Sequence, residues 1–199
     1  MTDLPHALAS LGLSVADLQR SAEQIVLFGS RGAQVSRVDS DWDILVIGDG
    51  CSRHTPMIDL VWVSPREVAT EAWLASELAG HVARWGVWIH GAPHWTAAVT
   101  CGAAAADRKA RRLASRVAAL ERAWDLLPTA YRREQQVMVR RDLQRHATLA
   151  RAEAVPPSSM LDRAWSGCRA PCDELLRLGV AAGVCSGFFE EKLARPERV

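Results

Sequence analysis

The sequence predicts an α+β fold, in which a small mixed β-sheet with helices is followed by a C-terminal helical bundle. Short runs of β-prone residues alternate with turn-forming residues in the first half only, at residues 25–28, 44–47 and 57–63. From Ala103 onward these runs vanish, and alanine, leucine and arginine recur at helical spacing. The chain of 199 residues is long enough for two small domains, each with its own core.

This change in composition divides the chain into two predicted domains, 1–95 and 103–199, joined by a linker over residues 92–102. The two halves of the chain also differ in the sign of their formal charge. Residues 1–100 hold six arginines and eleven acidic residues, a formal charge of −5. Residues 101–199 hold eighteen basic and twelve acidic residues, a formal charge of +6. The basic second half favours contact with a triphosphate, a nucleic acid or an acidic partner.

Capping and turn signals set the remaining elements of the first half. Ser64, Pro65 and Glu67 are typical of a helix start, with a serine N-cap, proline at the first helical position and a glutamate that completes a capping box. The expected order is helix 14–21, strand 25–28, helical turn and loop 31–40, strand 44–47, loop 51–56, strand 57–63, helix 64–84 and strand 86–91.

Prolines punctuate the predicted helices of the second half. Pro128 ends the first long helix, and Pro156-Pro157 end the second. The expected helices cover residues 103–127, 129–154, 159–166, 172–185 and 187–194.

Composition also indicates the cellular compartment in which the protein is expected. No apolar run approaches the ~20 residues needed to cross a bilayer, and the N-terminus does not resemble a signal peptide. The five cysteines form an odd, scattered set that is typical of reduced thiols, at positions 51, 101, 168, 172 and 185. A cytoplasmic protein without a membrane partner is therefore expected.

Three aspartates stand at or in the predicted strands. Asp41 and Asp43 are two positions apart at the start of one strand, so both side chains point to the same face. Asp59 lies in the next strand, and directly opposed side chains of paired strands lie within about 5 Å. Carboxylates this close repel one another unless a cation balances them, and Mg²⁺ binds to one or two carboxylates together with phosphate oxygens. The alternative is that Asp41 and Asp43 are two solvated aspartates after a surface turn.

A tight turn at Gly29-Ser30 ends the first strand, ten residues before Asp41. Glycine allows close approach of the backbone to a phosphate, and the Ser30 hydroxyl can donate to phosphate oxygens. Arg31 follows directly and is either a contact of the triphosphate or a solvated turn arginine.

The pattern Gly29-Ser30, then Asp41-x-Asp43, then Asp59 on a later strand resembles the signature of the DNA polymerase β nucleotidyltransferase superfamily. Its Gly-Ser-Arg opening is similar to the minimal and kanamycin-type nucleotidyltransferases, over roughly residues 20–95. The resemblance implies that Asp41, Asp43 and Asp59 hold two Mg²⁺ ions, for which Mn²⁺ can substitute. It also implies that Gly29, Ser30 and Arg31 bind the nucleotide.

The implied reaction transfers a nucleoside monophosphate from an NTP to an acceptor hydroxyl and releases pyrophosphate. AMP from ATP is the commoner group in this branch. The acceptor is left open among a protein, as in toxin–antitoxin pairs, an RNA end and an aminoglycoside-type small molecule. A net positive bundle is poorly suited to a polycationic drug, which favours a protein or RNA. A homodimer is also left open.

Further residues of the bundle are candidates without a motif to support them. In kanamycin-type relatives a glutamate of the helical domain is the general base, which makes Glu121 or Glu134 candidates. Arg141 and His146 match the loose Arg-x4-His pattern of HEPN ribonucleases, although such a match is common in an arginine-rich segment. The competing class is a non-catalytic antitoxin or binding module that keeps the fold.

Overall fold

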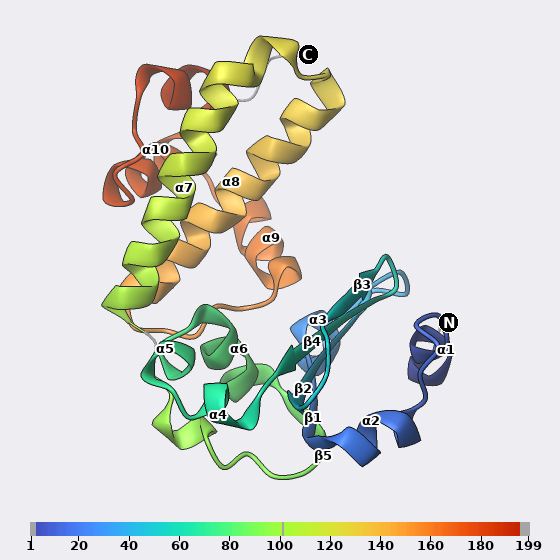
Figure 1. Cartoon of the computed structure of the whole chain (residues 1–199). Helices are drawn as coiled ribbons and strands as arrows, with labels where there is room; N and C mark the ends of the chain where they lie inside the picture. Colours follow the sequence, from blue (N-terminus) through green and yellow to red (C-terminus); the bar gives the residue numbers. More distant parts are fainter. Residues whose placement is uncertain (1–2, 101, 196–199) are drawn as a thin grey trace. The chain divides into compact units, whose positions relative to one another are not determined.

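The computed structural model describes residues 3–100 and 102–195, and the chain forms two compact units, Met1–Cys101 and Gly102–Val199 (Figure 1). The first unit holds a five-stranded mixed sheet with short helices, and the second is helical. The predicted α+β class is confirmed. In the described ranges no helix combines the length and the apolarity required to cross a membrane.

The sheet of the N-terminal unit has the order β3-β4-β2-β1-β5. β2 and β4 are parallel, whereas β1 pairs antiparallel with β2 and β5, and β3 pairs antiparallel with β4. The strands are β1 (Ala22–Phe28), β2 (Trp42–Gly48), β3 (Arg53–Thr55), β4 (Ile58–Val63) and β5 (Val87–His90).

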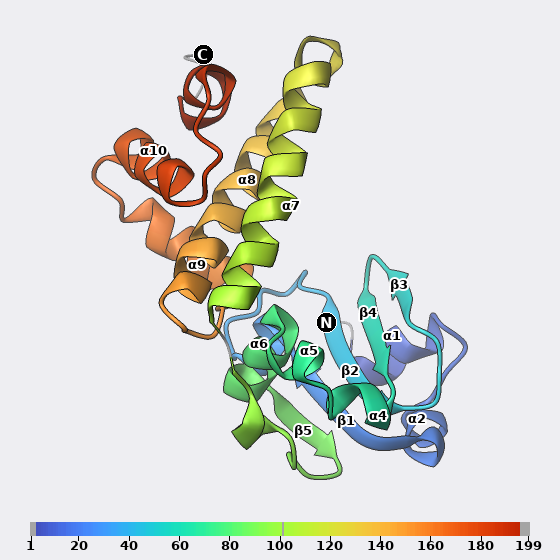
Figure 2. The same ribbon diagram turned by 60° about the vertical axis from the view of Figure 1, so that its left-hand side comes forward.

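Helices cover both faces of this sheet (Figure 2). On one face Val26, Leu45 and Val63 pack against α4 to α6, and on the other face Ile25, Ile44 and Leu60 pack against α1 and α2. The alternation of the strands therefore separates two cores, as the two-residue period of a strand requires. The helices are α1 (Leu4–Ala9), α2 (Val15–Ser21), α3 (Gly29–Gly32), α4 (Pro65–Val68), α5 (Glu71–Leu74), α6 (Glu77–Trp85) and the 3₁₀ turn η1 (Thr96–Ala98).

The expectation of one helix over residues 64–84 is wrong. Three short helices occupy this segment, because Thr70 and Ser76 act as internal N-caps. The Thr70 hydroxyl accepts from the Trp73 amide (3.2 Å), and the Ser76 hydroxyl accepts from the Ala79 amide (3.0 Å). Side-chain caps of this kind compete with a continuous helix.

Two other elements were not expected. Strand β3 lies in the segment interpreted as a loop, and its order comes from pairing with β4. The predicted linker is partly core, because Trp95 is buried and its indole N–H donates to Gln24 Oε1 at 3.2 Å. Trp88 donates to the same oxygen, so Gln24 joins β1, β5 and the segment after β5.

The helical unit is built on a hairpin of two long helices, α7 and α8 (Figure 1). Leu113 and Leu120 of α7 pack against Leu143 of α8, with Phe189 from the C-terminal segment in the same core. Its elements are α7 (Ala103–Ala123), the 3₁₀ turn η2 (Trp124–Leu126), α8 (Thr129–Ala150), α9 (Ser158–Ser166), α10 (Pro171–Ala181) and the π-helical turn η3 (Phe189–Ala194).

Four cysteines are free thiols: Cys51, Cys168, Cys172 and Cys185. Cys101 lies outside the described residues.

Phe189 should be a major determinant of the stability of the helical unit. Its side chain is fully buried, and its ring lies where a Cβ on Gly179 would be only 2.6 Å away. Phe189→Ala should lower the free energy of unfolding by about 3–5 kcal/mol, because it leaves a cavity in this core. The control Val180→Ala, at a position 66% exposed on α10, should change it by under about 0.5 kcal/mol in urea denaturation. Equal effects would contradict this packing.

Candidate active site

The candidate site lies at one edge of the sheet, where β1 ends and where β2 and β4 begin. Asp43 of β2 is paired with Phe28, the last residue of β1, and with Asp59 of β4. Because β2 and β4 are parallel and in register there, Asp43 and Asp59 are direct neighbours on one sheet face, with backbones about 4.8 Å apart. Asp41 precedes β2 in the same segment.

Gly29 is required at the turn that follows β1. Its φ of +64° lies in the left-handed region, and a Cβ at this position would be 1.8 Å from Asp43 Oδ2. Any side chain here would therefore collide with the carboxylate. The glycine allows the turn to lie directly against Asp43.

His81 is a residue that the sequence reasoning missed. It lies buried on α6, and its Nε2 accepts a hydrogen bond from the Gly29 amide at 3.1 Å. Its ring contacts Phe28 edge-on and Trp85 at a tilt, with centroids 6.1 and 5.2 Å away. Accepting from a backbone amide requires an unprotonated Nε2, so His81 in this arrangement is neutral. A lone histidine in an amphipathic helix gives no sequence signal for such a contact.

Arg31 connects the turn after β1 to the segment before β2. Its Nε donates to the Asp41 carbonyl (3.0 Å) and its Nη2 to the Ser40 carbonyl (2.6 Å). The guanidinium also stacks over the Trp42 ring, 4.2 Å from the centroid. The sequence predicted either a contact of the triphosphate or a solvated turn arginine, and these contacts to the Ser40 and Asp41 carbonyls are a third role. Arg31 holds Asp41 and Trp42 in place.

The electrostatics of the site are unbalanced. The pKa of Asp43 is raised to about 7, first by burial and then by the nearby carboxylates of Asp41 and Asp59, while Arg31 acts in the opposite direction. Asp43 is thus held where its ionised form is disfavoured near neutral pH. Such a carboxylate is a ready ligand for a cation, because a nearby positive charge favours ionisation.

His54 is a second residue that was not anticipated. It lies on β3 opposite Asp59, with Nδ1 3.7 Å from Asp59 Oδ1. Both side chains are substantially exposed, so this contact is a weak one. It was missed because the segment containing His54 was interpreted as a loop.

Within residues 3–100 and 102–195, no group of three or more histidine, cysteine, aspartate or glutamate side chains is close enough to hold a metal ion by itself. Asp41, Asp43 and Asp59 are near enough to influence the Asp43 pKa, but they do not form a preformed cluster. Mg²⁺ fits this arrangement only if ligand oxygens such as phosphates complete its coordination shell.

Ser30 is the second residue of α3, half-buried next to Gly29. Its backbone carbonyl accepts from the Val35 amide at 2.9 Å, which folds the following loop back on the turn. In the part of the chain that the structure describes, the Ser30 hydroxyl itself has no hydrogen-bond partner. It can therefore donate to a ligand.

The candidate residues of the bundle are not brought together. Glu121 near the end of α7 and Glu134 near the start of α8 are both exposed, and nothing distinguishes them as a base. Arg141 donates to Asp162 (Nε to Oδ1, 3.0 Å), whereas His146 is buried and burial lowers its pKa. Five helical positions separate the two by about 140° around α8, so they do not form a catalytic pair on one face.

In comparison with known proteins, no family model matches this chain and no curated protein matches it.

Asp43 should make the metal-free protein less stable as pH rises. Its folded-state pKa of about 7 exceeds the ordinary value of 3.8 for an aspartate, so the folded state binds the proton more tightly and stability falls between about pH 4 and pH 7. Asp43→Asn should therefore stabilise the protein at pH 8 by on the order of 1–2 kcal/mol after solvent screening, and should have no such effect below pH 4. Urea denaturation in EDTA across this range measures it. The control Asp49→Asn, at an exposed position after β2, should show no comparable pH dependence.

The contacts of Arg31 predict a structural cost for a conservative change. Arg31→Lys can keep only one of the two carbonyl contacts and loses the planar stack on Trp42. The free energy of unfolding should fall by about 1–3 kcal/mol. Arg37→Lys, at an exposed position in the same loop, is the matched control. Equal stability of the two variants would show that Arg31 does not hold the segment before β2.

Proposed function

We propose that the N-terminal unit is a metal-dependent nucleotidyltransferase of the DNA polymerase β type. It transfers a nucleoside monophosphate from an NTP to an acceptor hydroxyl and releases pyrophosphate. The observation that carries this proposal is the pairing of β2 with β4, in which Asp43 faces Asp59 beside the Gly29-Ser30 turn. Three carboxylates beside a glycine-serine turn are the parts that this reaction needs.

The residues fit a divalent cation. Asp43 has a raised pKa caused by burial and by two like charges, and a bound cation relieves both causes. Asp41, Asp43 and Asp59 would hold Mg²⁺, or Mn²⁺ in its place, together with phosphate oxygens of the substrate. When bound, the metal would neutralise charge on the phosphates and would lower the pKa of the acceptor hydroxyl.

The residues around the carboxylates would orient the substrate. The Ser30 hydroxyl would donate to a phosphate oxygen, and Gly29 lets the turn that carries Ser30 lie directly against the Asp43 carboxylate. Arg31 and His81 are positioning residues, because they hold the two ends of this turn through backbone contacts. Most of the rate would come from this positioning and from charge neutralisation.

During transfer the acceptor oxygen bonds to the α-phosphorus while the bond from that phosphorus to the pyrophosphate oxygen breaks. The hydroxyl proton leaves to a base, for which Glu121 and Glu134 remain candidates. ATP is the expected donor by resemblance alone, since no contact to a base is defined. We place this activity in the cytoplasm, where NTPs are available and free thiols persist.

The acceptor is better matched to a protein or an RNA than to an aminoglycoside-type molecule. A polycationic acceptor needs an acidic binding surface, whereas residues 101–199 carry a formal charge of +6. This observation favours an acceptor that carries negative charge.

The second candidate is a non-catalytic binding or antitoxin module with the same fold. Such a module has no need for a buried carboxylate with a pKa near 7 between two others, because holding it there lowers stability. Catalysis is therefore the better explanation of the site.

Transfer should depend on the paired carboxylates. The full chain is incubated with each of the four α-³²P-labelled NTPs and Mg²⁺ in lysate of the native host, and label is followed on gels and thin-layer plates. Wild type should place label on a protein or RNA band, and Asp43→Asn and Asp59→Asn should each lower the rate by about 10²–10³-fold. EDTA should abolish it.

Asp49→Asn keeps all three candidate carboxylates and removes an exposed one, so it should label at the wild-type rate. Retained labelling in Asp43→Asn would overturn the assignment of the site. Absence of label in every lysate, together with a partner that is neutralised equally by wild type and Asp43→Asn, would establish the binding-module alternative.

A further inference from the structure

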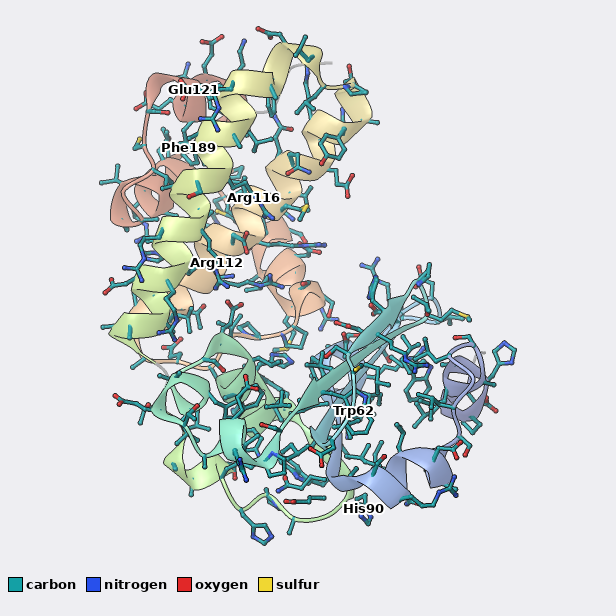
Figure 3. The ribbon with its side chains drawn as sticks, in the orientation of Figure 1. Trp62, His90, Arg112, Arg116, Glu121 and Phe189 are labelled. Atoms are coloured by element: carbon teal, nitrogen blue, oxygen red, sulfur yellow. The ribbon has the colours of Figure 1, made fainter. Side chains whose placement is uncertain are left out.

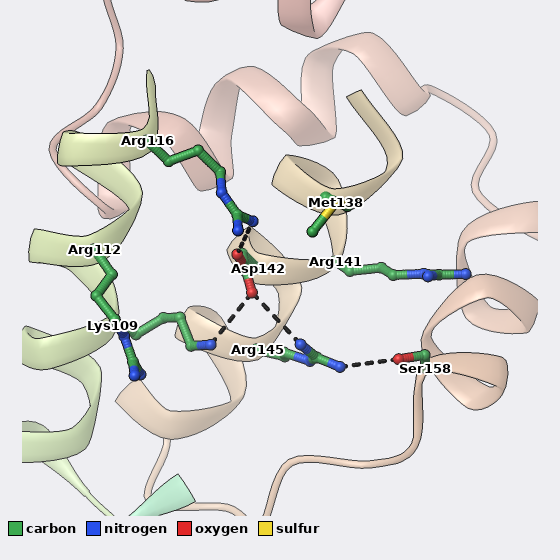
Figure 4. A pocket seen from close by; sticks show the side chains of 8 residues that line it. All are labelled: Lys109, Arg112, Arg116, Met138, Arg141, Asp142, Arg145 and Ser158. Atoms are coloured by element: carbon green, nitrogen blue, oxygen red, sulfur yellow. Dashed lines mark hydrogen bonds and ion pairs between the residues drawn. The ribbon is translucent and has the colours of Figure 1, made fainter. Parts of the chain in front are cut away.

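The helical unit contains a cleft of about 310 Å³ between α7, α8 and the start of α9 (Figure 4). Its walls come from successive turns of the two long helices, and Figure 3 shows Arg112 and Arg116 one turn apart on α7. Eight residues line it: Lys109, Arg112, Arg116, Met138, Arg141, Asp142, Arg145 and Ser158.

A single carboxylate stands at the centre of this cleft. Asp142 accepts from Arg116 at 2.8 Å and from Lys109 at 3.2 Å, and Arg145 lies 3.5 Å from it. Figure 4 shows these three side chains converging on Asp142 from both long helices. The Lys109 and Asp142 side chains are only 8% and 17% exposed, so their charges are poorly screened by water.

The lining carries far more positive than negative charge. Five basic residues face one acid, a formal charge of +4. Outside the lining, Asp162 is paired with both Arg141 and Arg140, a further cation, so these two residues together add no net negative charge. Like charges gathered in a half-enclosed space repel one another, and an anion in that space would offset the repulsion.

Polar groups at the rim suit an oxyanion. Ser158 is the first residue of α9, and its hydroxyl accepts from Arg145 at 2.9 Å while keeping its own proton available to a ligand. The α9 N-terminus is preceded by Pro157, and no side chain caps it. The amides of a first helical turn and guanidinium groups both bind phosphate oxygens.

We propose that this cleft binds the polyphosphate group of a small molecule, such as inorganic triphosphate or the phosphate chain of a nucleotide. The formal charge of +4 matches a compact anion with several charges. The described lining residues include no aromatic side chain on which a base could stack, and Met138 is their one apolar member. The cleft therefore recognises the phosphates rather than the base.

A short polyphosphate fits better than a nucleic acid. A single strand is bound along an extended groove with aromatic stacking platforms. Here three cations from the two long helices converge on Asp142, and the cleft lies within the size range of small-ligand pockets. This site belongs to the helical unit alone and does not depend on the proposed nucleotidyl transfer.

The test is calorimetric titration of the full chain with sodium tripolyphosphate in EDTA, at constant ionic strength. Wild type should bind one equivalent, and Arg112→Gln should weaken binding about tenfold, since a charge-assisted contact is lost. The matched control is Arg111→Gln, which removes the same charge at the preceding position, exposed like Arg112 but outside the cleft. Its affinity should stay within about twofold of wild type. ATP in EDTA should bind with an affinity similar to tripolyphosphate.

A second variant separates binding from folding. Asp142→Asn raises the formal charge of the lining from +4 to +5, so it should tighten tripolyphosphate binding several-fold. Loss of these ion pairs should lower thermal stability in either case, but a cluster that serves only to hold α7 against α8 would show no gain in affinity.

The proposal is overturned if tripolyphosphate does not bind, or if Arg112→Gln and Arg111→Gln weaken it equally. It is also overturned if a short single-stranded RNA binds tightly with equal loss in both variants while tripolyphosphate fails to compete. That pattern would indicate an open nucleic-acid surface along α7.

Discussion

The N-terminal unit is organised around two carboxylates that face each other across the parallel strands β2 and β4. Asp43 and Asp59 are held by the same backbone ladder that pairs the apolar residues of the sheet, so their repulsion cannot be relieved by moving apart. The pKa of Asp43 near 7 follows first from burial of its carboxyl group and then from the neighbouring carboxylates of Asp41 and Asp59. Burial of the flanking strand residues on both sheet faces provides the free energy that keeps this arrangement in place.

The surrounding residues hold the backbone segments next to Asp43 in place. Gly29 makes room for the Asp43 carboxylate, and the buried His81 accepts from the Gly29 amide. Arg31 then joins the far side of the turn to the carbonyls of Ser40 and Asp41. A glycine, a neutral imidazole and a guanidinium thus place three backbone segments around one carboxylate without neutralising it. Under the proposed function, a cation and an anionic substrate would complete this site.

The helical unit gathers positive rather than negative charge. Cations from α7 and α8 outnumber the acids between them, and Asp142 balances only part of their charge. Packing of Leu113, Leu143 and Phe189 in the bundle core holds the helices together despite this repulsion. One unit therefore concentrates negative charge at a sheet edge, while the other concentrates positive charge in a cleft. On the two proposals made above, both units would bind phosphate-bearing ligands, the first through a metal and the second directly.

The sequence by itself determined the α+β class, four of the five strands and the two long helices, because strand and helix periodicities and prolines are local signals. It also singled out Asp41, Asp43 and Asp59 by their spacing. Only the tertiary structure decided which residues support them. His81 meets Gly29 across 52 positions, strand β3 with His54 exists through its pairing to β4, and Trp95 joins the core through Gln24. These contacts depend on long-range packing, and no local preference of the chain encodes them.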